Sequence, residues 1–209
     1  VAIVIAPDPP FSEELLMRAA ISATVAAVKV AIIANKVDLA DADPAFERRL
    51  AVYEALGYPV FRVSARHRPV EAVTTLVPLL ADTTTLLMGQ SGMGKSTLVN
   101  VLVPDAGLET REISAALSAG RHTTTFTRMF EHAVAGDARR AARIVDSPGF
   151  QTFGLAHISL SQLEHEVANG ARFVYFQFCI SVLVMSFKRS SDIYYVKVGE
   201  SVAARAAGF

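Results

Sequence analysis

Residues 84–102 read TTLLMGQSGMGKSTLVNVL, and this stretch decides the fold. Its middle, residues 89–96, matches the phosphate-loop pattern G-x-x-x-x-G-K-[ST]. The TTLLM run at 84–88, rich in β-branched and apolar residues, predicts a strand before the loop, and the spacing at 95–102 predicts a helix after it. Glycines let such a loop turn its N–H groups toward phosphate oxygens, and the helix N-terminus adds partial positive charge. A plain glycine-rich turn is the alternative, but it does not explain the flanking strand and helix.

The phosphate loop supplies most of the predicted nucleotide-binding residues. Lys95 is expected to reach the β- and γ-phosphates, and the Ser96 hydroxyl is expected to ligate Mg²⁺. The predicted phosphate-binding set is Gly89, Gln90, Ser91, Gly92, Met93, Gly94, Lys95, Ser96 and Thr97.

Apolar runs and helical spacings alternate along the rest of the chain. The predicted strands are residues 1–6, 29–34, 59–64, 84–88, 126–134 and 143–146. The predicted helices are a segment that starts at Ser12, then residues 44–56, 69–80, 95–102 and 159–169. This alternation predicts an α/β fold of the P-loop NTPase type, with a mostly parallel sheet and helices on both faces.

Composition excludes several classes of protein. The chain has 209 residues, is 52% hydrophobic, and carries 20 basic and 20 acidic residues, which excludes disorder for most of it. Zero net charge also excludes a uniformly basic coat for nucleic acid, although a local basic patch is still allowed. Cys179 is the single cysteine, which excludes an internal disulfide and a zinc site built mainly on thiolates.

Two segments bear on the ends of the chain. The chain opens on VAIVIA, and this apolar run predicts a buried strand. Because it has no initiator Met, we expect a fragment that lacks upstream sequence. Residues 173–187 are uncharged, but a transmembrane helix needs about 20 apolar residues, so a buried helix or strand pair is predicted. A membrane role is the remote alternative.

A second motif, Asn35-Lys36-Val37-Asp38, follows the strand predicted at 29–34. In GTPases the N-K-x-D motif selects guanine, because its carboxylate accepts from both the ring N–H and the exocyclic amine, a donor pair that adenine lacks. Asn35 is expected to tie this loop to the phosphate loop, and the Lys36 stem to lie along the base. The alternative is a helix N-cap formed by Asp38 or Asp41.

Ser64-Ala65 follows the next predicted strand and is expected to present a backbone N–H to guanine O6. The order of the motifs is informative, because ordinary GTPases place the phosphate loop before N-K-x-D. Here N-K-x-D and Ser-Ala precede the phosphate loop. A circular permutation explains this order without changing the site, since a compact domain keeps its sheet when its termini are relocated.

Two further motifs resemble GTPase switches. Asp146-Ser147-Pro148-Gly149 is a D-x-x-G sequence after a predicted strand. Asp146 is expected to hold Mg²⁺ through a water, and the Gly149 N–H to contact the γ-phosphate. An ordinary Ser-Pro-Gly turn is the alternative.

The upstream switch segment, residues 121–125 (RHTTT), lies between the phosphate loop and D-x-x-G. Thr124 is expected to complete the Mg²⁺ shell. Ras-type GTPases orient the attacking water with a Gln after D-x-x-G, but Phe150 stands there. His122 is therefore the candidate for that catalytic role, with a solvated loop histidine as the alternative.

Taken together, these motifs resemble the RsgA (YjeQ) family of circularly permuted, ribosome-dependent GTPases. The resemblance covers about residues 1–165, and G-R-H-T-T-T at 120–125 with D-S-P-G-F at 146–150 distinguishes it from other permuted GTPases. It implies GTP hydrolysis stimulated by the small ribosomal subunit and its rRNA, in late maturation of that subunit. It also implies that His122 aids hydrolysis and that Thr124 belongs to a switch. We expect a cytoplasmic monomer, with GTP/GDP and Mg²⁺ as its ligands.

The resemblance does not extend over a whole family member. Family members carry an N-terminal OB-fold and a C-terminal zinc-binding domain with three cysteines and a histidine. Nothing in this chain corresponds to the OB-fold, and no zinc site is recognisable after residue 171. We therefore expect a GTPase domain at 1–170 and a divergent segment at 171–209.

Two other functions stay open on the sequence. One is a nucleotide-binding core that lacks ribosome docking and turns GTP over slowly. The other is an ATP-dependent P-loop enzyme such as a small-molecule kinase, against which the N-K-x-D motif at 35–38 argues.

Overall fold

The structure is a computed structural model, and it describes residues 1–108, 110, 127–134, 137–150, 154, 158–159 and 162. The strands are β1 (Ala2–Ile5), β2 (Ala31–Ala34), β3 (Val60–Arg62), β4 (Thr84–Met88), β5 (Arg128–Val134) and β6 (Asp137–Asp146). The α-helices are α1 (Glu13–Val25), α2 (Pro44–Ala55), α3 (Pro69–Leu80) and α4 (Lys95–Leu102). Two short 3₁₀ helices are η1 (Val37–Ala42) and η2 (Pro104–Ala106).

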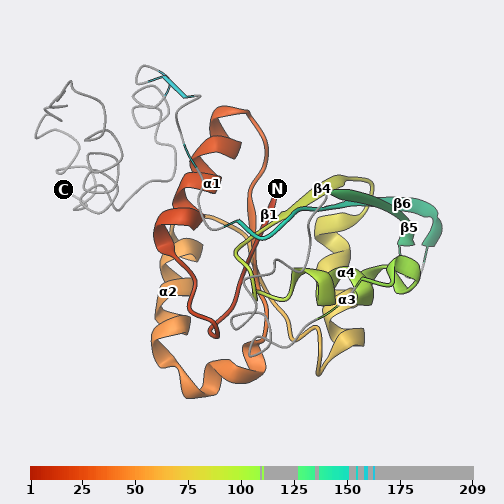
Figure 1. Cartoon of the computed structure of the whole chain (residues 1–209), viewed down its shortest axis with the longest axis horizontal. Helices are drawn as coiled ribbons and strands as arrows, with labels where there is room; N and C mark the ends of the chain where they lie inside the picture. Colours follow the sequence, from red (N-terminus) through yellow and green to blue (C-terminus); the bar gives the residue numbers. More distant parts are fainter. Residues whose placement is uncertain are drawn as a thin grey trace, which may run out of the picture.

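The strands form one six-stranded sheet in the order β3-β2-β1-β4-β6-β5. Neighbouring strands are parallel throughout, except that β5 runs antiparallel to β6. Figure 1 shows α1 and α2 on one side of the sheet and α3 and α4 on the other. The predicted α/β fold, with a mostly parallel sheet covered on both faces, is therefore confirmed.

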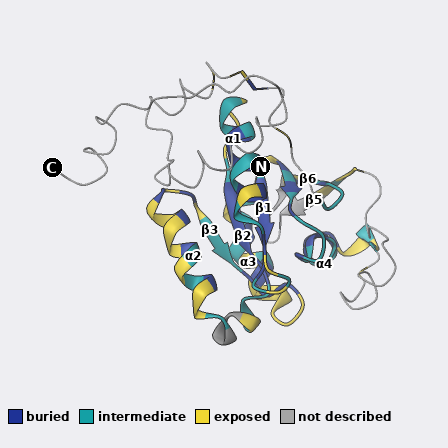
Figure 2. Ribbon diagram, turned by 60° about the vertical axis from the view of Figure 1, so that its left-hand side comes forward, coloured by how far each residue is buried: buried dark blue, intermediate teal, exposed yellow. Residues whose placement is uncertain are grey.

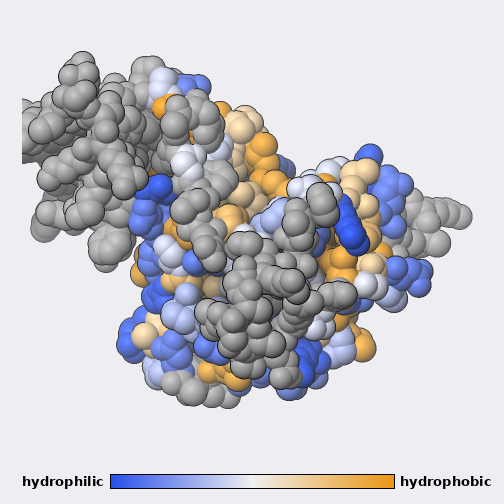
Figure 3. Space-filling view, in the orientation of Figure 1, coloured by the Kyte–Doolittle hydropathy of each residue, from blue (hydrophilic) through white to orange (hydrophobic). Residues whose placement is uncertain are grey.

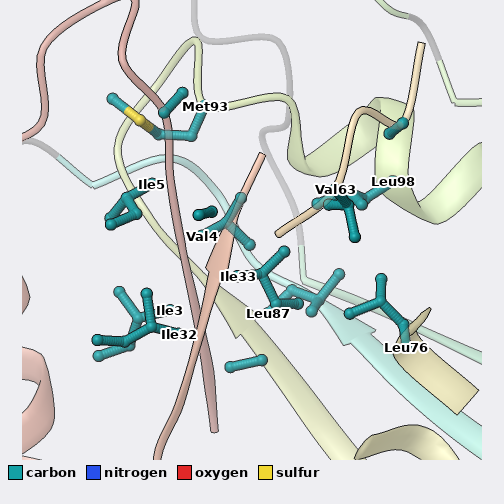
Figure 4. Close-up of a cluster of buried hydrophobic side chains, with 14 of the residues drawn as sticks. Ile3, Val4, Ile5, Ile32, Ile33, Val63, Leu76, Leu87, Met93 and Leu98 are labelled. Carbon is teal, nitrogen blue, oxygen red and sulfur yellow. The ribbon is translucent and has the colours of Figure 1, made fainter. Parts of the chain in front are cut away.

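Alternation along the strands sends apolar side chains into both helical layers. The register pairs Ile3 with Ile32 and Val4 with Ile33, and Figure 4 shows Ile3 and Ile32 on one side of the strands. Ile33 lies on the other side, together with Leu76 of α3. These five side chains are at most 1% exposed, so both layers bury the middle of the sheet. Figure 2 shows the same pattern as dark central strands beneath helices with exposed outer faces.

Local sequence explains where the first helices begin. Ser12 caps α1, because its hydroxyl accepts from the Leu15 N–H at 3.3 Å. Asp43 caps α2, and its carboxylate accepts from two N–H groups of the first turn. The capping alternative for Asp38 and Asp41 is therefore wrong for this helix, since Asp43 occupies the N-cap position.

The main differences from the predicted elements are at the far edge of the sheet. β6 begins at Asp137, six residues before the predicted start at Arg143. Arg139 and Arg140 interrupt the apolar pattern there, so the sequence does not indicate a strand. Antiparallel pairing with β5 nevertheless supplies the backbone hydrogen bonds that extend β6. Figure 3 shows mostly hydrophilic residues over α2. The helix predicted at 159–169 falls almost entirely outside the described residues.

Within the described part of the chain, every helix is too short or too polar to cross a membrane. The uncharged run at 173–187 and Cys179 lie outside that part.

Candidate nucleotide-binding site

One edge of the sheet collects all the motifs that the structure describes. β2, β3, β4 and β6 are parallel strands. β2 ends before Asn35, β3 before Val63-Ser64, β4 before Gly89, and β6 ends at Asp146. Because parallel strands end at the same edge, four loops meet there although they lie far apart in the sequence. This is the position at which open α/β sheets bind ligands.

Asn35 joins three of these loops. Its Nδ2 donates to the Met93 carbonyl at 3.0 Å, and its Oδ1 accepts from the Ala65 N–H at 3.1 Å. The residue is 2% exposed, so both hydrogen bonds are shielded from water. The predicted tie between the base-reading loop and the phosphate loop is therefore present. The Ala65 N–H already donates to Asn35 Oδ1. Its predicted contact with guanine O6 therefore requires that the N–H be shared between two acceptors or that the hydrogen bond to Asn35 break.

Two glycines of the phosphate loop permit close approaches. Gly94 has φ +87°, and a Cβ there would lie 2.4 Å from Asn35 Nδ2. Gly89 has φ +153°, and a Cβ there would lie 2.4 Å from the Val4 carbonyl oxygen. Both positions therefore require glycine, for conformation and for space.

The side chain of Asp38 lies beside the Ser-Ala loop. The Ser64 hydroxyl donates a short hydrogen bond to its Oδ1, and His67 Nε2 lies 3.6 Å from its Oδ2. The side chain of Asp38 is 24% exposed, so it is accessible to a ligand at this edge. Ser64 thus orients the carboxylate that is predicted to select guanine.

Lys36 has an unusual backbone conformation, and its side chain binds the loop that follows β1. Its φ is +60°, in the left-handed region that non-glycine residues rarely adopt. Its Nζ donates to the Asp8 carbonyl at 2.7 Å. Burial lowers the pKa of the amine, and the nearby carboxylates of Asp8 and Asp38 oppose this shift.

Lys95 is buried beneath the phosphate loop at the start of α4. It is 6% exposed, and its Nζ donates to the carbonyls of Gly89 at 2.7 Å and Gln90 at 3.0 Å. Burial lowers the pKa of the amine to about 8, although the negative charge of Asp146 opposes the shift. Two carbonyl groups therefore hold the ammonium where the loop would enclose phosphates.

Asp146 at the end of β6 is completely buried. Neither carboxylate oxygen has a hydrogen-bond partner among the described residues. Burial raises the pKa of this carboxyl, and the positive charges of Lys95 and Arg128 oppose the rise. A buried carboxylate without donors fits a cation ligand, because a bound ion would compensate its charge.

The D-x-x-G loop packs directly on the phosphate loop. A Cβ at Gly149 would lie 2.9 Å from the backbone N and Cα of Ser91, and the Phe150 N–H donates to the Gly89 carbonyl at 3.3 Å. Ser147 fixes the start of the loop, because its hydroxyl donates to the Leu87 carbonyl at 2.7 Å. Gly149 is thus placed beside the position predicted for phosphate.

The other phosphate-loop residues have separate roles. Met93 is 1% exposed and its side chain lies near Ile5 in the core, so only its backbone faces the loop (Figure 4). The side chain of Gln90 accepts from the Ser12 N–H at 2.6 Å. Ser91, Gly92, Ser96 and Thr97 are all partly exposed around the loop and the first turn of α4.

Sequence reasoning missed two participants, Asp8 and Ser12. They contact the predicted motifs through main-chain atoms, so no residue pattern marks them. His122 and Thr124 lie outside the described residues, and the structure does not test their predicted roles. Among the described residues no group of three or more His, Cys, Asp or Glu side chains could hold a metal ion by itself.

The fold and the site define a class of protein: a P-loop nucleotide-binding domain whose base-reading motif precedes its phosphate loop. The profile of the RsgA GTPase family matches residues 1–156, and the chain belongs to this family. The protein named small ribosomal subunit biogenesis GTPase RsgA from Burkholderia pseudomallei (strain 1710b) is 52% identical over 162 residues, which cover 78% of this chain and 50% of that protein.

A protein of the same name from Paraburkholderia phytofirmans is 50% identical over 162 residues, covering 78% of this chain and 51% of its own length. The chain therefore spans about half the length of these curated relatives.

Solved structures share the fold. YjeQ from Thermotoga maritima has a TM-score of 0.56 at 20% identity, over 91% of this chain and 71% of its own. YloQ, described as a circularly permuted GTPase, has a TM-score of 0.58 at 18% identity, over 93% of this chain and 69% of its own. These matches confirm the predicted permuted GTPase fold.

Proposed function

We propose that this chain is the core of a GTP-hydrolysing switch that acts in late maturation of the small ribosomal subunit. The observation that carries this proposal is the pair of buried hydrogen bonds made by Asn35, which joins the N-K-x-D, Ser-Ala and phosphate loops into one site. The names of the curated relatives support the ribosomal context. Such a protein would work in the cytoplasm.

Guanine selection in this proposal belongs to Asp38. The carboxylate accepts from the ring N–H and the exocyclic amine of guanine, and Ser64 orients it. Adenine offers no such donor pair, so it would leave the carboxylate unpaired. Lys95 and the backbone N–H groups of the phosphate loop bind the phosphates.

We further propose that Ser96, Thr124 and Asp146 hold Mg²⁺ with the nucleotide. The isolated carboxylate of Asp146 supports this assignment. When bound, the ion would neutralise charge on the phosphate oxygens. Gly149, packed on Ser91, would place its N–H near the γ-phosphate and report its presence.

His122 is proposed to orient or deprotonate the attacking water, since Phe150 has no polar group for that role. His122→Ala is expected to slow GTP hydrolysis roughly 10²–10⁴-fold, the usual contribution of one such group. GTP affinity should be unchanged, because a group that only orients or deprotonates water adds little to ground-state binding. Single-turnover hydrolysis and nucleotide titration measure the two quantities separately. Turnover at the wild-type rate would remove His122 from the mechanism.

The test of the whole proposal is GTP hydrolysis by this chain, with and without purified small ribosomal subunits, using ATP as the control nucleotide. Strong stimulation with GTP alone supports the switch. Guanine-specific binding with slow, unstimulated turnover instead supports the second candidate, a nucleotide-binding core without ribosome docking. Equal use of ATP would contradict both and favour a P-loop kinase.

The division of the chain is also a proposal. We assign residues 1–170 to the GTPase domain and 171–209 to a divergent segment. Limited proteolysis followed by mass spectrometry tests this boundary, and a protected fragment extending well beyond residue 170 would contradict it.

A further inference from the structure

The loop between β1 and α1, residues 7–12, contacts both nucleotide-binding loops although it belongs to neither. We call it the bridging loop. Near its start the Asp8 carbonyl accepts from Lys36 Nζ at 2.7 Å. At its end the Ser12 N–H donates to Gln90 Oε1 at 2.6 Å. The side chains of one base-loop residue and one phosphate-loop residue therefore both bind the main chain of the same short segment.

The bridging loop is itself fixed to the core. Phe11 is 5% exposed, and its ring meets Phe46 of α2 edge-on with centroids 6.0 Å apart. The Arg49 guanidinium carbon lies 3.7 Å from the centre of the Phe11 ring, and Arg49 Nη2 donates to the Phe11 carbonyl at 2.9 Å. Arg49 also pairs with Glu13 at 2.6 Å. These contacts from α2 make the loop a fixed support rather than a free connection.

Both side chains that bind the bridging loop place their polar ends on its main chain. The side-chain carbonyl oxygen of Gln90 accepts from the Ser12 N–H, and the Lys36 amine donates to the Asp8 carbonyl. Lys36 does so from a left-handed backbone conformation, which persists only where the surroundings hold it. The hydrogen bond to Asp8 and those of the preceding Asn35 provide that restraint.

We propose that the bridging loop is a positioning element that fixes the spacing between the base-reading loop and the phosphate loop, with Gln90 and Lys36 as positioning residues. This inference rests on the proposed function, because it presumes a guanine nucleotide that spans both loops. Such a ligand gains affinity when both loops are held at the separation of its base and phosphates. A ligand that touches the phosphate loop alone gains nothing from that spacing.

Ser12 offers a matched pair of variants in the full chain. Ser12→Pro removes the N–H that donates to Gln90, and the observed φ of −84° is close to the range of proline. Ser12→Ala keeps that N–H. Both variants lose the hydroxyl that caps α1, so they differ mainly in the hydrogen bond to the phosphate loop. GDP, which spans both loops, is compared with inorganic pyrophosphate, which binds the phosphate loop alone.

Ser12→Pro is expected to raise the Kd for GDP about fivefold to tenfold relative to Ser12→Ala, as for the loss of one partly buried hydrogen bond. The Kd for pyrophosphate should be the same in both variants. Equal GDP affinity in the two variants would overturn the inference, and so would a parallel loss of both ligands, which indicates a general defect of the phosphate loop.

Two measurements keep the test decisive. If Ser12→Pro does not fold, Gln90→Met removes the same hydrogen bond from the other side while keeping the length of the side chain and the backbone N–H. The same selective loss of GDP affinity is expected, and unchanged GDP affinity would overturn the inference. Failure of the wild-type chain to bind GDP would instead contradict the proposed function, and the inference with it.

Discussion

Lys95→Ala is expected to abolish nucleotide binding while leaving the fold intact. The ammonium is buried, and the carbonyls of Gly89 and Gln90 hold it beneath the loop, so no other described cation occupies its position. Without it, the phosphates would enter a site whose nearest buried charge is the carboxylate of Asp146. Like charges in a poorly solvated site repel strongly, because low polarisability leaves them unscreened.

Titration with a fluorescent GDP analogue measures this effect. Lys95→Met is the second variant, because it keeps most of the side-chain volume and removes only the charge. Lys29→Ala is the matched control, since Lys29 is exposed and lies in the connection between α1 and β2. Thermal unfolding of each variant separates loss of binding from loss of structure. Binding of GDP by Lys95→Met within threefold of the wild type would contradict the assignment.

The succession of strands and helices, and the position of each described motif after a strand, followed from local sequence patterns. Buried parallel strands give largely apolar runs, so VAIIA at 30–34 and LLM at 86–88 indicated β2 and β4. Each motif followed such a run directly. Because the carboxyl ends of parallel strands meet at one edge, the sequence alone predicted that Asn35, Gly89 and Asp146 lie close together.

What the sequence could not predict depends on main-chain atoms and on distant pairing. The bonds from Lys36 to Asp8 and from Gln90 to Ser12 end on backbone groups, which every residue possesses. The early start of β6 depends on pairing with β5 and not on its own pattern. Likewise, no local spacing indicates that the Asp146 carboxylate is buried without a hydrogen-bond partner among the described residues.

Asp38→Asn is expected to reverse the base preference of the site. The Ser64 hydroxyl donates to Oδ1, which is a carbonyl oxygen in this variant and still accepts that bond. The new amide group then occupies the Oδ2 position, which lies 3.6 Å from His67 Nε2 at the partly exposed side of the residue. There it would face the two donors of guanine with donors of its own, leaving buried groups on both sides unpaired. A site with buried hydrogen-bonding groups discriminates by about 10⁴-fold between a base that pairs with them and one that does not. The affinity for GTP should therefore fall by that order.

Xanthine nucleotides make this prediction specific, because xanthine carries a carbonyl where guanine has its exocyclic amine. The amide of D38N can donate to that carbonyl, so xanthosine triphosphate should bind the variant better than GTP does. ATP should bind both proteins equally poorly, since it uses neither arrangement. Competition binding with the three triphosphates measures the order of preference. Asp105→Asn, an exposed change of the same chemistry in η2, is the control. Retention of GTP preference by D38N would show that the base lies elsewhere, and the role of the N-K-x-D loop would then be limited to the Asn35 junction that holds the phosphate loop in place.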